Sequence, residues 1–290
     1  MRLLLASPLL APLAFAQAPP AVAASPKVVS GEMGLRFTSQ YFFRGIVQEN
    51  QGIIAQPWLE LGYDLYEGKD TVKNLDLTFG LWNSLHDGPT GSGGSGQSMW
   101  YESDFYIGLS ADVGERLTLG MTYTSYYGAN GVRPNVQELA FSAVYNDEKG
   151  KLISSVESGL QPSVVLAFEL DGQADGGTAG NLGTYLQLGV EPSWNIGKIG
   201  KTDVTLAVPV TMGFSLKDYY ENAGDDEFFG FFDVGAVASC ALPWMPSRLG
   251  PWTADLGLHW LVLGDTNQER FGTGGDSSEL IISLGASTTF

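Results

Sequence analysis

Charged side chains are scarce in this chain, and cysteine and histidine are almost absent. Asp, Glu, Lys and Arg make up 16% of the 290 residues, well below the ~25% that is usual in soluble domains. The single cysteine, Cys240, cannot form an internal disulfide, and one Cys with two His offers no zinc or iron–sulfur ligand spacing. We therefore expect no metal site and no cofactor.

Basic residues are few as well. The chain carries 15 Lys and Arg against 32 Asp and Glu, a formal charge of −17. A nucleic-acid partner needs a basic face for its phosphates, so this balance argues against nucleic acid. Glycine, in contrast, is abundant with 38 residues, and aromatic residues reach 12%.

Long hydrophobic runs are missing after the first segment. Residues 1–16 carry one charge, Arg2, then an apolar stretch and small residues at its end. This pattern is typical of a secretory signal peptide with cleavage after Ala16, or alternatively after Ala23. Beyond it no apolar run approaches the ~18 residues that a membrane-spanning helix needs. We therefore expect an exported chain that is either soluble or a β-barrel.

The rest of the chain alternates with a period of two. Near the C-terminus Leu280, Ile282 and Leu284 share one face, and the residues between them are mostly small or polar, which is a strand pattern. Twelve such segments follow one another, joined by connections that alternate between short and long. Residues 147–159 could form a long turn, a small helix or an early strand. The sequence predicts one all-β domain over residues 28–290, a 12-stranded antiparallel up-and-down barrel.

Two solvents could meet the apolar face of these strands. In a soluble sandwich or lipocalin-like barrel that face is inside, whereas in a transmembrane barrel it meets lipid. Strands of ~10 residues, an even strand count and aromatic residues grouped at two heights favour a transmembrane β-barrel in an outer membrane. The aromatic residues expected at the two membrane interfaces include Tyr41, Tyr63, Tyr127, Trp194, Trp252, Trp260 and Phe290.

Charge is confined to the opposite face and to the connections, so we expect a charged lumen. Its surplus of acids predicts a preference for cations if the barrel conducts. Arg44 has two interpretations: an inward arginine at a constriction, or a loop arginine paired with Glu49 or with solvent, the second being preferred. The residues expected to line the lumen are Arg36, Arg44, Glu60, Asp64, Asp76, Glu102, Asp104, Glu138, Glu169, Glu191 and Asp255.

Two segments resemble known families. The final Phe290, with Leu284 and Ile282 at alternate positions before it, resembles the C-terminal signal of bacterial outer-membrane proteins. This resemblance implies a Gram-negative-type outer membrane, recognition by the barrel assembly machinery, and a periplasmic location for the end of the barrel that carries both termini. The segment 43–46, Phe-Arg-Gly-Ile, resembles the opening of the TorF-type family of outer-membrane porins.

These patterns predict a porin-like channel for passive diffusion of small, cationic or neutral solutes, embedded in outer-membrane lipid. A closed structural or adhesive barrel that binds partners through its loops is the first alternative. An outer-membrane lipid hydrolase is the second, and it needs a Ser–His pair on the outer face. His259 has inward parity and His86 lies in an expected loop, so we expect no enzyme.

Overall fold

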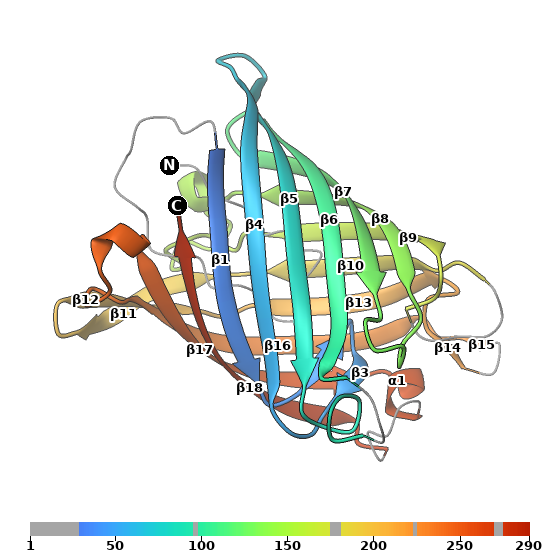
Figure 1. Cartoon of the computed structure of the whole chain (residues 1–290). Helices are drawn as coiled ribbons and strands as arrows, with labels where there is room; N and C mark the ends of the chain where they lie inside the picture. Colours follow the sequence, from blue (N-terminus) through green and yellow to red (C-terminus); the bar gives the residue numbers. More distant parts are fainter. Residues whose placement is uncertain (1–28, 95–97, 175–180, 223–224, 270–274) are drawn as a thin grey trace.

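The computed structural model describes residues 29–94, 98–174, 181–222, 225–269 and 275–290; the expected signal peptide lies outside the described residues. The strands form one closed antiparallel ring (Figure 1), and the 12-stranded barrel is confirmed. Its crossings are β1 (Val29–Thr38), β4 (Ile54–Glu67), β5 (Val72–His86), β6 (Trp100–Val113), β7 (Leu117–Tyr127), β8 (Val136–Tyr145), β9 (Ser163–Asp171), β10 (Thr184–Val190) with β11 (Ser193–Ile199), β12 (Thr202–Ala207) with β13 (Val210–Lys217), β16 (Phe229–Ala241), β17 (Trp252–Leu263) and β18 (Ser278–Thr289).

Prolines split two of these crossings, so fourteen strand segments make twelve crossings. β10 and β11 are separated at Pro192, and β12 and β13 at Pro209. Proline lacks the N–H that a strand ladder requires, so the regular pairing stops at both positions. The two breaks lie opposite each other, and the Val208 N–H donates to the Pro192 carbonyl at 2.9 Å. The hairpin therefore remains joined through its irregular centre.

The ring closes between its first and last strands. Arg36 pairs with Gly285 in the β1–β18 register. The Gly31 N–H donates to the Phe290 carbonyl at 3.0 Å, and the Phe290 N–H donates to the Gly31 carbonyl at 2.9 Å. Both ends of the described barrel therefore lie at one rim (Figure 1), which we call the terminal end; the opposite rim is the loop end.

The connections differ from the expected simple alternation. Three at the terminal end are short, at 68–71, 114–116 and 200–201, but those at 146–162 and 242–251 are long. Residues 147–159 form a long turn that contains a short 3-10 helix, η1 (Glu148–Gly150). At the loop end β14 (Glu221–Asn222) pairs with β15 (Asp225–Asp226), and α1 (Asp265–Glu269) is a five-residue helix. A second 3-10 helix, η2 (Ser247–Leu249), lies in the connection 242–251.

No helix in the described part of the chain is long and apolar enough to cross a membrane.

The outer face of the barrel is apolar. On β1, Met33, Leu35 and Phe37 are 42%, 39% and 46% exposed, whereas the alternate residue Arg36 is 6% exposed. A closed antiparallel barrel with an exposed apolar outer face and a polar inner face suits a lipid bilayer, because strands pair around the whole ring and no open sheet edge meets lipid. The protein is an outer-membrane β-barrel.

The first strand ends before Tyr41, a residue that was expected at the membrane interface. β1 ends at Thr38, and residues 41–49 form a separate hairpin of β2 (Tyr41–Phe43) and β3 (Ile46–Glu49). All nine residues of this hairpin are buried. Figure 1 shows it at the loop end. It packs against inward-facing residues of distant strands. The apolar cluster around it includes Phe42, Ile46, Val47, Val165, Tyr185, Phe231, Leu261 and Ile281. We call residues 41–49 the luminal hairpin.

Candidate functional site in the lumen

The turn of the luminal hairpin places Arg44 in an uncommon conformation. Arg44 has a φ of 51° and Gly45 a φ of 81°. A two-residue hairpin turn with positive φ at both positions matches the right-handed twist of its strands, and glycine adopts it without steric cost. A positive φ is uncommon for an arginine. Contacts of the Arg44 side chain must therefore offset the energetic cost of this backbone conformation, and the guanidinium makes such contacts.

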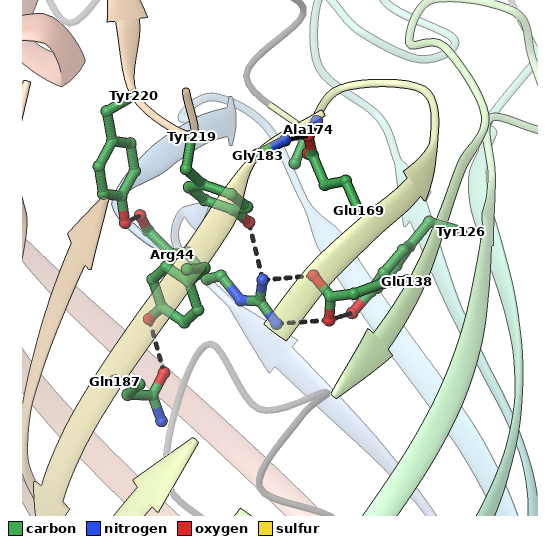
Figure 2. Close-up of polar contacts among 10 residues, drawn as sticks. Arg44, Tyr126, Glu138, Glu169, Ala174, Gly183, Gln187, Tyr219 and Tyr220 are labelled. Carbon is green, nitrogen blue, oxygen red and sulfur yellow. Dashed lines mark hydrogen bonds and ion pairs between the residues drawn. The ribbon is translucent and has the colours of Figure 1, made fainter. Parts of the chain in front are cut away.

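The guanidinium of Arg44 binds the inner wall of the barrel. Its two terminal nitrogens donate to the two carboxylate oxygens of Glu138, at 2.6 and 2.8 Å. One of these nitrogens also donates to the Tyr219 hydroxyl at 2.9 Å. Figure 2 shows Arg44 pointing at Glu138, with Tyr126 and Tyr219 beside the pair. Such a bidentate charge-assisted pair fixes the direction of the hairpin as well as its position.

Aromatic rings enclose the same guanidinium. Its central carbon lies 4.1 Å from the centre of the Tyr185 ring and 5.5 Å from that of Tyr219. Tyr220 packs at 5.1 Å from Tyr219 and donates its hydroxyl hydrogen to the Arg44 carbonyl at 2.9 Å. A cation above a desolvated aromatic face gains electrostatic energy. We call Tyr126, Glu138, Tyr185 and Tyr219 the Arg44 pocket.

Arg133 forms a second ion pair on the other side of the hairpin. It belongs to the β7–β8 connection, is buried, and binds the buried carboxylate of Glu102. Tyr41 donates to the other oxygen of Glu102 at 2.9 Å. Phe43 lies between the two arginines, with guanidinium carbons 5.0 and 5.8 Å from its ring centre. The hairpin thus contacts this second ion pair through Tyr41 and Phe43, while Arg44 gives it an ion pair of its own.

Both loop arginines remain charged in this environment. Burial by itself lowers the pKa of Arg44, but the Glu138 carboxylate and the neighbouring tyrosines outweigh it and raise the pKa well above the ordinary value. For Arg133 burial also lowers the pKa, and Glu102 raises it beyond that loss. An opposite charge at contact distance favours the ionised form. Arg44 and Arg133 are therefore permanent cations beside the buried carboxylates of Glu138 and Glu102.

The terminal half of the lumen is more open to water. Asp64 and Asp76 are register partners on β4 and β5 and are half-buried. Like charges directly opposite one another in a sheet repel, so this pair makes the inner wall locally negative. Arg36 pairs with Asp255 at 2.7 Å, and Glu60 accepts the Tyr106 hydroxyl hydrogen at 2.8 Å.

The remaining predicted lumen residues occupy separate positions. Asp104 is buried beside Glu102 on β6. Glu169 accepts from the backbone N–H groups of Ala174 and Gly183, at 2.6 and 2.7 Å (Figure 2). Glu191 lies half-buried at the break between β10 and β11. Among groups of three or more His, Cys, Asp and Glu in the described residues, none could hold a metal ion.

The preferred interpretation of Arg44 is wrong. Arg44 pairs with Glu138, while Glu49 accepts from the Thr90 hydroxyl and backbone N–H at 2.8 Å each. The expected interface role of Tyr41 is also wrong, because Tyr41 is 2% exposed and faces the lumen after the chain turns inward beyond Thr38. The other expected interface residues are exposed or half-exposed, and their interface role stays a prediction: Tyr63, Tyr127, Trp194, Trp252, Trp260 and Phe290.

Both histidines are buried and have polar partners. His86 ends β5 instead of lying in a loop; its ring nitrogens contact Ser84 at 2.8 Å and Thr90 at 2.7 Å. His259 contacts Asp233 at 2.8 Å. The Ser84–His86 pair is buried, with both residues 0% exposed. It therefore does not provide the lipid-facing Ser–His pair that a lipid hydrolase would need.

Sequence reasoning missed Arg133 and the tyrosines of the Arg44 pocket. Arg133 lies in a connection, and its partner Glu102 is 31 residues away. Tyr219 and Tyr220 form an adjacent pair in an otherwise polar loop. That pair was the one available signal, because two large aromatic rings in an exposed loop need a surface to cover them.

A substitution in the turn of the luminal hairpin tests how tightly this hairpin is packed inside the barrel. A Cβ at Gly45 would lie 2.8 Å from the Phe231 Cβ and 2.9 Å from the Asn267 side-chain nitrogen. We expect Gly45→Ala to loosen the hairpin and expose it to protease. Gly114→Ala is the matched control, because Gly114 also has a positive φ but its Cβ would meet nothing within 4 Å. Limited proteolysis of folded protein compares them, and equal cleavage would mean that the turn is not tightly packed.

Comparisons with known proteins give structural similarities only. No protein-family model matches the chain. No curated protein matches it. The NanC porin shares 11% identity over 90% of this chain and 98% of its own, with a TM-score of 0.42. The COG4313 outer membrane channel from Pseudomonas putida F1 shares 12% over 94% and 100%, with a TM-score of 0.46. The β domain of the Bordetella autotransporter BrkA shares 13% over 90% and 98%, with a TM-score of 0.40.

At these identities and TM-scores the similarities say nothing about substrate or mechanism. Solved outer-membrane porins and channels are among these structural neighbours. The TorF-type resemblance stays a prediction, because no family model matches the chain.

Proposed function

We propose that this protein is a porin-like channel for passive diffusion of small cationic or neutral solutes, closed at the loop end by the luminal hairpin. The observation that carries the proposal is the acidic terminal half of the lumen, where the opposed carboxylates of Asp64 and Asp76 are half-buried and within reach of water. Rings of carboxylates select cations in pores by their field. Outer-membrane lipid and the barrel assembly machinery remain expected partners.

The loop half of the lumen supports a gated pore rather than a permanently open one. The hairpin is buried along its whole length, and it is held by the Arg44–Glu138 ion pair and by the hydrogen bond from Tyr41 to Glu102. Passage therefore requires the hairpin to move as a unit away from the wall. Its polar contacts with the barrel and the other loops involve Tyr41, Arg44, Gln48 and Glu49, so the closed state has a definable set of hydrogen bonds and ion pairs to break.

Single-channel recording in a planar bilayer under a KCl gradient tests the proposal. We expect discrete openings with a reversal potential that favours K⁺, because the luminal acids concentrate cations. A double variant, Asp64→Asn with Asp76→Asn, removes two of those charges and is expected to move the reversal potential toward zero while leaving the number of openings unchanged.

The alternatives predict other results in the same recording. Openings that favour Cl⁻ would keep the channel and discard the role assigned to the acids. The absence of conductance from folded, inserted protein would instead support the closed structural barrel. That second candidate is favoured by one observation, the full burial of residues 41–49 inside the barrel.

A further inference from the structure

We propose that the Arg44 pocket is a binding site for guanidinium-bearing solutes, and that Arg44 occupies it as an internal stand-in when the hairpin is docked. The inference rests on the proposed channel function and names the substrate class of the same lumen. The polar groups that bind the guanidinium come from the barrel and its loops: Tyr126 lies on β7, Glu138 on β8, Tyr185 on β10, and Tyr219 follows β13. The hairpin contributes the guanidinium itself and the ring of Phe43.

The pocket persists when the hairpin leaves. Glu138 and Tyr126 lie on paired strands, β7 and β8, and the Tyr126 hydroxyl lies 3.4 Å from a Glu138 oxygen. The Tyr185 hydroxyl donates to the side-chain oxygen of Gln187, on the same strand, at 2.8 Å. These contacts do not involve the hairpin. Removing Arg44 therefore leaves a positioned carboxylate beside aromatic faces.

The chemistry of this pocket selects a planar cation. Glu138 offers two oxygens to two parallel N–H donors, at 2.6 and 2.8 Å in the docked state. The Tyr185 face lies 4.1 Å from the guanidinium carbon. A guanidinium satisfies both features, since it is flat, always charged and presents its donors as a fork, whereas an ammonium is a compact point charge. The buried carboxylate excludes anions, and a neutral solute leaves its charge unpaired.

The site around Arg133, in contrast, is built partly from residues of the luminal hairpin. Tyr41, which donates to Glu102, and Phe43, which lies beside Arg133, both belong to the luminal hairpin. When the hairpin undocks, this second site loses two of its members. The Arg44 pocket is accordingly the position where an external cation can replace the chain's own.

Chemical rescue tests the inference without requiring conduction. Refolded full-length Arg44→Ala protein is heated in low-millimolar guanidinium chloride, and the temperature at which the folded band disappears on a semi-native gel is compared with equal concentrations of sodium chloride and urea. We expect guanidinium alone to raise that temperature by about 2–4 °C, a shift typical of modest ligand stabilisation in a domain of this size. Native protein, whose pocket is filled, is expected to show no rise.

Glu138 provides the matched control. The double variant Arg44→Ala with Glu138→Gln is expected to lose the guanidinium effect. An equal rise in this double variant, or an equal rise with sodium or urea, would overturn the proposal. Where Arg44→Ala fails to fold, Arg44→Gln replaces it, because glutamine keeps a planar polar head without the charge. Its expected outcomes are the same.

The channel recording separates the two proposals. Potassium conductance without any guanidinium rescue would contradict the substrate class and leave the channel intact. Guanidinium rescue without conductance would support the pocket and contradict passive diffusion.

Discussion

Replacing Glu138 with leucine is expected to weaken docking of the luminal hairpin by about 3–5 kcal/mol, the usual cost of leaving one partner of a buried ion pair alone. The side chains of Arg44 and Glu138 are 6% and 1% exposed. Without the carboxylate, the guanidinium either stays buried and unpaired or leaves with its hairpin. For the unpaired guanidinium, leaving with the hairpin is more favourable than staying buried, because the charge is then hydrated again.

The readout is the open fraction in planar-bilayer recordings. Since ~1.4 kcal/mol corresponds to tenfold in an equilibrium constant, the docked-to-undocked ratio should fall roughly 100- to 3000-fold. Glu138→Leu combined with Arg44→Met is the control, because it removes both charges at once. Exchanging a buried ion pair for apolar residues is often neutral, so we expect the double variant to close again. Equal open fractions for the two variants would contradict the ion-pair explanation.

The second large effect is expected from removing the hairpin altogether. Thr38 and Ile54 are register partners at the loop ends of β1 and β4, so an Asn-Gly turn can replace residues 39–53 and close the hairpin directly. The twelve crossings keep their pairing, and we expect a barrel that folds and stays open for most of the recording. Its cation preference should exceed that of the native protein, because the lumen loses Arg44 and exposes Glu138.

Arg36→Ala is the companion control for this experiment. Arg36 pairs with Asp255 on the inner wall of the barrel, outside the hairpin. Its removal is expected to change the reversal potential and leave the open fraction as it is. If the shortened barrel folds and still passes no current, wall side chains fill the lumen, and the closed structural barrel becomes the better description.

Local alternation was enough to predict the barrel because strand faces are a local property. On β18 each successive side chain points to the opposite face, so Leu280, Ile282 and Leu284 are exposed at 51–57% while Ser283 is 4% exposed. The same parity placed Arg36 with inward residues. Parity alone does not reveal irregularities in the ladder, such as the register shift between Ser84 and Leu85.

The luminal hairpin could not be predicted in the same way. Tyr41 and Phe43 keep the parity of the apolar face of β1, and the one break in the alternation, Phe42, does not by itself indicate an inward turn after Thr38. What decides the turn is contact with distant strands: Glu138 lies 94 residues from Arg44, and Tyr219 lies 175 residues away. A sequence pattern of period two contains no information about such partners.

The sequence by itself therefore determined the class of fold and its orientation toward lipid. Both follow from side-chain alternation and the scarcity of charge on one face, which act residue by residue. The tertiary structure alone decided that the luminal hairpin folds into the loop end of the barrel and that Arg44 is bound in an aromatic and acidic pocket. Those features depend on ring closure, which brings β7, β8, β10 and the first connection around one point inside the barrel.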